Sequence, residues 1–238
     1  MNNKISRVID ILNQRVNKMP LDVSLAKKSN GKWDKYSSSD FVSHVNALSL
    51  GLLELGIKPT DKVAIISTNR PEWNFVDFAI QQIGGVSVPM YPNITVEDYT
   101  YIFADADVKI VFVETEELVS KVLEATKNLE KQLHIYTFNK IEGRKHWKEV
   151  QETGKSRSLV EIKPLTDAIK PEDLITLIYT SGTTGKPKGV MLSNENLVSN
   201  VLSVHHLLPV KQGGKVLSFL PLCHVFERIA TYVYMFKD

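Results

Sequence analysis

The sequence predicts an α/β fold in which helices flank a doubly wound, mostly parallel sheet. Short runs of Val, Ile and Leu recur along the chain with little polar alternation, which is typical of strands buried on both faces of a parallel sheet. Longer stretches, whose apolar residues have helical spacing, separate these runs. Alternation of strands and helices with short connections favours a doubly wound sheet.

Each expected strand is a run rich in β-branched residues. The expected strands are residues 62–67, 86–91, 108–114, 133–138, 174–180, 189–193 and 215–221. The expected helices are residues 39–55, 71–83, 96–105, 115–131, 194–207 and 223–236. Pro71 suits the first turn of its helix, and Ser193 offers a hydroxyl N-cap to the helix that follows it. Asn196 stands where Glu or Gln would complete a capping box, so we expect that box to stay incomplete.

A further helix is expected near the N-terminus, because apolar residues recur there on one helical face. They are Ile5, Val8, Ile9, Leu12 and Val16. The polar face mixes charges of both signs and lacks aromatic residues. We therefore expect the helix to pack on its own domain, with binding to a membrane surface as the alternative.

A charged segment separates two blocks of the predicted fold. Residues at about 140–163 are charged and poor in large apolar side chains, which predicts a surface excursion between a first sheet block at about 20–140 and a second block at about 171–238. The lysines and arginines of this excursion could form a patch for anionic lipid or a partner. Because glutamates are interspersed among them, we favour a solvated surface.

Composition limits the class of protein. The 238 residues are 43% hydrophobic and 24% charged, as in ordinary globular proteins. A formal net charge of +2 is too small to indicate a nucleic-acid partner. The single cysteine, Cys223, excludes an internal disulfide and fits a reducing compartment. Charged residues interrupt the N-terminus where a signal peptide would be apolar, and no run is long and apolar enough to span a bilayer, so we expect a cytoplasmic protein.

The stretch from Tyr179 to Leu192, YTSGTTGKPKGVML, combines glycines, hydroxyls and lysines directly after an apolar strand. Glycines allow positive φ and a close approach of backbone N–H groups to an anion, hydroxyls add donors, and lysines neutralise phosphate charge. We expect positive φ at Gly182, Gly185 and Gly189. The stretch is not a Walker loop, because Pro187 follows Gly185-Lys186 and Thr180 stands where the first glycine is needed.

Residues 179–190 resemble the phosphate-loop signature of the adenylate-forming superfamily, which includes acyl-CoA synthetases, luciferases and the adenylation domains of peptide synthetases. That signature runs aromatic-Thr-Ser-Gly-Ser/Thr-Thr-Gly-x-Pro-Lys-Gly-Val. Residues 56–114 resemble the first βαβ block of the family. FLPLCHVFERIA, at 219–230, resembles its next core motif in the form seen in long-chain fatty acyl-CoA synthetases.

The resemblance covers about residues 20–238 and implies that the chain is the N-terminal part of an AMP-binding domain. The family's Tyr-Gly-x-Thr-Glu motif, its Gly-Asp ribose motif and its C-terminal domain do not occur in the sequence. Where many relatives carry His after Leu-Ser, this chain has Asn194, which we expect to open a helix without touching phosphate. We also expect self-association through the edge formed by residues 215–221 and the helix at 223–236.

The reaction that the resemblance implies is activation of a fatty acid by ATP to an acyl-adenylate, followed by transfer to coenzyme A, with Mg²⁺ required. The resemblance assigns Lys188 and His224 to catalysis and Thr184 to Mg²⁺. It assigns ATP binding to Thr180, Ser181, Gly182, Thr183, Thr184, Gly185, Lys186 and Lys188. The alternative function is a short, non-catalytic module that binds nucleotide or acyl ligand, or works with another chain.

Four other features have structural interpretations. His224 could instead be a buried histidine bonded to a backbone carbonyl. Glu227 and Arg228 are expected to form a structural ion pair or a helix-surface pair. A Cys223–His224 thiol dyad is disfavoured, because adjacent strand residues point to opposite faces. The pair His205-His206 lacks a nearby third ligand, which disfavours a metal site.

Overall fold

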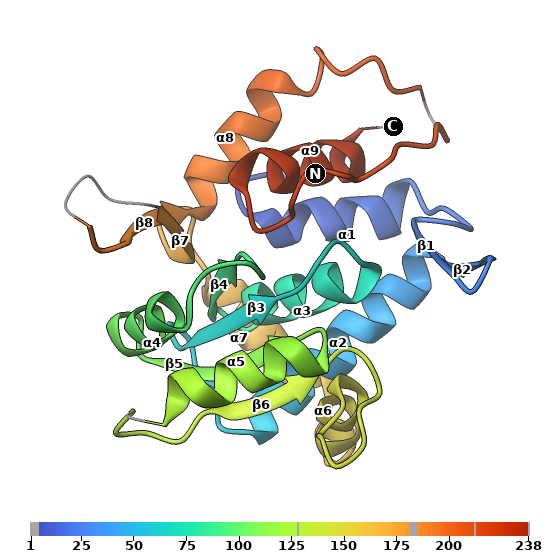
Figure 1. The fold of residues 1–238 in the computed structure, drawn as a ribbon. Coiled ribbons are helices and arrows are strands. Elements are labelled where there is room, and N and C mark those ends of the chain that lie inside the picture. The colour runs from blue at the N-terminus through green and yellow to red at the C-terminus, as the bar shows by residue number, and fades with distance from the viewer. Residues whose placement is uncertain (1–4, 128, 181–184, 212, 238) are drawn as a thin grey trace.

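A six-stranded sheet, with strand order β6-β5-β3-β4-β7-β8, forms the centre of the computed structural model, which describes residues 5–127, 129–180, 185–211 and 213–237 (Figure 1). Its strands are β3 (Lys62–Ile66), β4 (Val86–Met90), β5 (Val108–Val113), β6 (His134–Thr137), β7 (Leu174–Thr180) and β8 (Lys188–Ser193). All neighbours pair in parallel except β7 and β8, which are antiparallel. The predicted mostly parallel sheet is confirmed.

Helices cover both faces of this sheet. They are α1 (Val8–Lys18), α2 (Ser38–Glu54), α3 (Pro71–Gln82), α4 (Val96–Asp105), α5 (Glu116–Thr126), α6 (Trp147–Thr153), α7 (Ile162–Ala168), α8 (Asn194–Val204) and α9 (Val225–Phe236). Successive strand residues alternate between two cores: Ile65 packs with α1, α2, α3, α8 and α9, whereas Ile66 packs with α4 and α5. The fold is therefore doubly wound, as predicted. Among the described helices, none has both the length and the hydrophobicity needed to cross a bilayer.

The strand predicted at 215–221 is wrong. These residues form neither helix nor strand, and Leu217 and Phe219 are 78% and 72% exposed. Their apolar pattern is that of a buried strand, but none of the described strands pairs with them. Such a pattern indicates that a segment is suited to a buried strand, but the segment becomes one only where a neighbouring strand pairs with it.

A hairpin near the N-terminus was not predicted. Strands β1 (Leu25–Ser29) and β2 (Lys32–Tyr36) pair in antiparallel register around Asn30 and Gly31, both of which have positive φ. An Asn-Gly pair between short strands is a strong signal for a two-residue turn. The signal was present in the sequence.

The stretch at about 140–163 is more ordered than a charged excursion suggests. It contains α6, whose Trp147 and Val150 are 3% and 0% exposed, and two short 3₁₀ turns at Gly154–Ser156 and Leu159–Glu161. Helix α6 lies against α2 at Gly51, where an added Cβ would come 1.8 Å from the Val150 carbonyl oxygen. This close approach fixes α6 on the domain.

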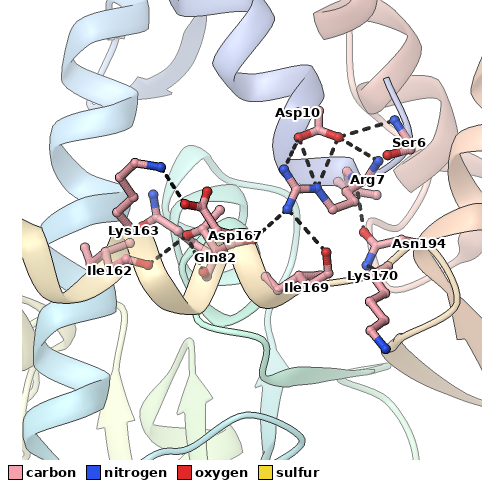
Figure 2. Close-up of polar contacts among 12 residues, drawn as sticks. Ser6, Arg7, Asp10, Gln82, Ile162, Lys163, Asp167, Ile169, Lys170 and Asn194 are labelled. Carbon is pink, nitrogen blue, oxygen red and sulfur yellow. Dashed lines mark hydrogen bonds and ion pairs between the residues drawn. The ribbon is translucent and has the colours of Figure 1, made fainter. Parts of the chain in front are cut away.

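Helix α1 packs on its own domain, as expected, and it holds the ends of two other helices. Arg15 Nε donates to the Met235 carbonyl at 2.9 Å, in the last turn of α9. Arg7, the N-cap of α1, donates from Nη1 to the Thr166 carbonyl (2.5 Å), near the end of α7. Figure 2 shows the second bond of this atom, to the Ile169 carbonyl (3.3 Å). A cation at a helix C-terminus satisfies free carbonyls and interacts favourably with the helix dipole.

The first turn of α8 shows that the expected incomplete capping box is wrong, and it shows which contacts Asn194 makes. Asn196 Oδ1 accepts the Ser193 backbone N–H at 3.0 Å while Ser193 Oγ caps the Asn196 N–H, so Asn completes the capping box. Asn194, which is 2% exposed, accepts the Val8 N–H at 3.0 Å and donates to the Lys170 carbonyl at 3.4 Å (Figure 2). Asn194 is therefore the first residue of α8, as expected, and its side chain links α1 to α8.

Candidate functional site

The predicted phosphate loop joins the ends of β7 and β8, where Thr180 is in register with Lys188. Ser181, Gly182, Thr183 and Thr184 lie outside the described residues, so their roles stay predictions. Gly185 has φ +90°, as predicted. Lys188 is exposed, and it has no ion pair or side-chain hydrogen bond with any residue that the structure describes. Its charge is thus available to an anion.

Gly189 is needed for close packing and does not have the expected positive φ. An added Cβ there would lie 3.0 Å from Tyr179 Cζ on the paired strand. Glycine therefore leaves room for the Tyr179 ring against β8. Tyr179 and Gly189, both residues of the loop signature, therefore pack against each other across the β7–β8 pair.

The last turns of α4 hold both flanks of the loop. The Tyr179 hydroxyl donates to Asp105 Oδ2 at 2.5 Å, and burial together with this hydrogen bond raises the pKa of Tyr179 above its usual value. Lys186 Nζ lies 5.5 Å from the centre of the Tyr101 ring, within cation–π range. Both contacts fix the base of the loop to a rigid helix.

A cavity of about 620 Å³ opens beside this loop, and three predicted site residues lie in its wall. Thr180 and Gly185 come from the loop, and His224 comes from the start of α9. Apolar side chains from β4, α4, β7 and the connection between β4 and α4 line much of the remainder, including Met90, Ile94, Ile102 and Ile178. The cavity thus combines residues at the two ends of the loop with an apolar wall. Lys186 and Lys188 are not among its lining residues.

His224 is the N-cap of α9 and is exposed, so the interpretation as a buried histidine is wrong. Its Nδ1 accepts the Phe226 backbone N–H at 3.2 Å. Because this bond occupies Nδ1 as an acceptor, Nε2 carries the proton in the neutral ring. The imidazole therefore offers an N–H donor on its far side.

The neighbouring Cys223 is buried, and burial raises the pKa of its thiol to about 12. A thiolate is the nucleophilic form of cysteine, and a buried apolar site suppresses it. The structure gives the thiol no hydrogen bond to His224, but the sequence argument from strand geometry does not apply, because both residues lie in the turn that leads into α9. Among the described residues, no group of three or more His, Cys, Asp or Glu side chains could hold a metal ion.

Arg228 has a different partner from the one expected. It pairs with Asp77 of α3, not with Glu227, and the two side chains are 1% and 0% exposed. Its guanidinium also donates to Ser87 Oγ and to Thr176 Oγ1, both at 2.7 Å. Burial acts to lower the pKa of Arg228, but the charges and hydrogen bonds of Asp77 and Tyr232 together outweigh it, so the net direction is upward.

These contacts lie where the sheet is weakest. Strands β4 and β7 are in register at a single pair, Ser87 with Thr176. Arg228 donates a hydrogen bond to each residue of that pair. Helix α9 therefore joins β6, β5, β3 and β4 to β7, the strand that leads into the loop. The sequence contains no local signal for this network, because Asp77 and Arg228 are 151 residues apart.

Comparison with known proteins identifies the family. The family of AMP-binding enzymes matches residues 12–237. Relatives include the long-chain-fatty-acid–CoA ligase FadD15 of Mycobacterium tuberculosis, 32% identical over 84% of this chain and 33% of its own length. The human long-chain-fatty-acid–CoA ligase ACSBG1 is 31% identical over 87% of this chain and 30% of its own length.

Solved structures share the fold. ATP-bound MatB from Rhodopseudomonas palustris has a TM-score of 0.75 at 23% identity, covering 98% of this chain and 44% of its own. The N-terminal domain of FACL13 from Mycobacterium tuberculosis has a TM-score of 0.73 at 21% identity, covering 97% of this chain and 55% of its own. The chain spans about a third of the length of the ligases it matches in sequence. The chain belongs to the family of AMP-binding enzymes, the adenylate-forming superfamily that its loop resembles.

Proposed function

We propose that this chain is the N-terminal part of a ligase that activates a long-chain fatty acid with ATP and transfers the acyl group to coenzyme A. The observation that carries the proposal is the shared cavity, whose wall contains the loop residues Thr180 and Gly185 together with His224. Long-chain-fatty-acid–CoA ligases among the relatives support the substrate class.

In this proposal the loop binds the phosphates of ATP. Hydroxyls of Thr180, Ser181 and Thr183 donate hydrogen bonds, and the glycines let backbone N–H groups approach. Lys186 and Lys188 balance the charge of the departing pyrophosphate, and Lys188 has no competing partner among the described residues. Such chemistry depends on positioning and electrostatic stabilisation more than on covalent catalysis by the protein.

The residues of the loop suit Mg²⁺ as well as ATP, because a threonine hydroxyl is an oxygen ligand of the kind this ion prefers. Thr184 would contribute that ligand, and the ion would supply further neutralisation of phosphate charge. In the proposal, the remaining ligands come from outside these 238 residues.

His224 would act at the fatty carboxylate. Its N–H on the side away from Phe226 is a donor for a carboxylate oxygen. The apolar lining around Met90, Ile94 and Ile102 supports an acyl group as the ligand of the adjoining wall. Donor and apolar wall together would orient the carboxylate toward the phosphate loop.

The test is palmitate-dependent exchange of pyrophosphate into ATP, measured with the whole ligase that would contain this chain. We expect exchange in the wild type, a loss of at least about tenfold in Lys188→Ala, and no change in Lys145→Ala. Lys145 is an exposed lysine far from the loop in sequence. Absence of exchange with every fatty acid tried would favour the non-catalytic module.

A further inference from the structure

Residues 215–222 form neither helix nor strand, yet they lead into the buried pair Leu222 and Cys223 and then into His224. Before Leu222 the large side chains face solvent, with Leu217 78% exposed. Packing alone therefore does little to hold residues 215–221. Its position depends on specific polar contacts.

Asn69 supplies those contacts. Its Nδ2 donates to the Leu220 carbonyl at 2.7 Å and to Ser218 Oγ at 2.9 Å, and its Oδ1 accepts the Leu222 N–H at 2.9 Å. Among the described residues, Asn69 makes every hydrogen bond that joins residues 215–222 to elements outside the segment and its turn into α9. One amide group satisfies two backbone groups as a neighbouring strand would.

Asn69 itself stands on a rigid base between β3 and α3. The residue before it, Thr68, is held by Glu114 of the adjoining strand end: its N–H and its hydroxyl both lie 2.8 Å from Glu114 Oε2. The residue after it, Arg70, bonds Glu72 at 3.0 Å. The amide of Asn69 is therefore presented from a fixed backbone.

The segment is held again on its other side. Arg228, four residues after His224, is locked in the interior by Asp77. His224 thus lies between two anchors, Asn69 acting on Leu222 and Asp77 acting on Arg228, both reached from the α3 region. With both ends fixed, the backbone of His224 has little freedom.

We propose that Asn69 is a positioning residue, which holds residues 218–222 so that His224 faces the cavity opposite Thr180 and Gly185. The proposal rests on the proposed function for the role of His224, but the anchoring itself does not. Asn69 is not among the residues that line the cavity. Its effect would pass through the backbone that it fixes.

The thiol of Cys223 gives a direct readout, because it is the single cysteine of the chain and is 2% exposed. Native-state reaction with an aromatic disulfide reagent requires local opening of residues 218–224. In Asn69→Ala the reaction should accelerate by about ten- to a hundredfold, the factor expected from losing one or two hydrogen bonds. Asn69→Asp, which keeps the acceptor for the Leu222 N–H, should give an intermediate rate.

Asn139→Ala is the matched control. Asn139 lies at the same edge of the sheet and accepts a hydrogen bond from Arg70 Nη1 at 2.9 Å, but it makes no hydrogen bond to residues 215–222. In this variant the Cys223 thiol should react at a rate within about twofold of the wild-type rate. Equal acceleration in Asn139→Ala and Asn69→Ala, or no acceleration in either, would overturn the anchoring.

A second measurement tests positioning for catalysis in the whole ligase. Asn69→Ala should lower kcat for acyl-adenylate formation about tenfold or more while leaving KM for ATP within about twofold, because the loop is held by β7, β8 and α4 and not by Asn69. Equal effects on both constants would refute the positioning role. If the ligase showed no activity, the proposed function would fail, while the thiol rates would still decide whether Asn69 is the anchor.

Discussion

Arg228 of α9 and Asp77 of α3 form an ion pair inside the protein, with Nη2 and Oδ1 2.5 Å apart. The pair lies over the single bridge between β4 and β7, and so joins the loop-bearing strand to the remainder of the sheet. Removing one partner leaves a buried charge without compensation.

Asp77→Ala should therefore lower the free energy of unfolding by about 3–5 kcal/mol, measured by urea denaturation. Asp167→Ala is the control, because the Lys163–Asp167 pair is a surface pair with side chains 78% and 58% exposed (Figure 2). Its loss should cost no more than about 0.5 kcal/mol. Similar losses in the two variants would contradict the role given to the buried pair.

A second prediction concerns the contact between α2 and α6. Glycine inside a helix is usually replaced by alanine with a gain of about 1 kcal/mol. Gly51→Ala should instead destabilise the protein, because its Cβ would meet the Val150 carbonyl oxygen at 1.8 Å and α6 would have to move. Thermal unfolding should show the opposite sign for Ser43→Ala, on the exposed side of the same helix. A stabilising Gly51→Ala would show that α6 does not pack there.

Stability should also fall as pH decreases from 7 toward 5. Burial lowers the pKa of His44 from its ordinary 6.5, so the unfolded chain binds a proton more readily than the folded one. His44 stacks on Phe75 with ring centres 4.6 Å apart and lies 3.1 Å from Gln151 Nε2. Its stabilising contribution is complete above the unfolded pKa and is lost as pH falls through the folded one.

The measurement is urea unfolding at pH 7 and pH 5. His44→Gln should show a smaller decrease in unfolding free energy than the wild type does. Ser43→Ala, which removes no titratable group, should retain the wild-type decrease. An unchanged decrease in His44→Gln would mean that protonation of His44 is not linked to folding.

Self-association through residues 215–221 and α9 stays a prediction, narrowed by the structure. Tyr232 and Val233 of α9 are buried at 1% and 0% exposure, so that part of the helix is already covered. The most exposed apolar side chains of this region are instead Leu217, Phe219 and Phe226. Exposed apolar clusters favour association. Sedimentation should show a dimer or larger species at high concentration that Leu217→Ser/Phe219→Ser abolishes; a monomeric wild type would contradict this.

The sequence predicts those parts of the fold whose signals are local. Continuous β-branched runs predict β3, β4 and β5, and Pro71 correctly marks the start of α3. Residues 215–221 carry the same kind of run but have no strand partner among the described residues, which no local pattern can reveal.

The candidate site likewise has a part that the sequence predicts and a part that it does not. The loop signature is contiguous and was recognised from sequence, whereas Asn69 and Asp77 act on residues about 150 positions away. Asn69 lies just before α3 and Asp77 lies in the middle of it, and no local pattern reveals the distant partner of either residue. Their roles appear only once the chain is folded.

The phosphate cradle is tested most directly by amide hydrogen exchange of residues 180–189 in this chain, with and without Mg-ATP. We expect ATP to protect these amides in the wild type and in Lys145→Ala. Lys188→Ala should lose much of that protection, because a charge-assisted contact contributes roughly 1.5–3 kcal/mol in a well-formed site. Equal protection in both lysine variants, or none in the wild type, would contradict the assignment of this loop to ATP phosphates.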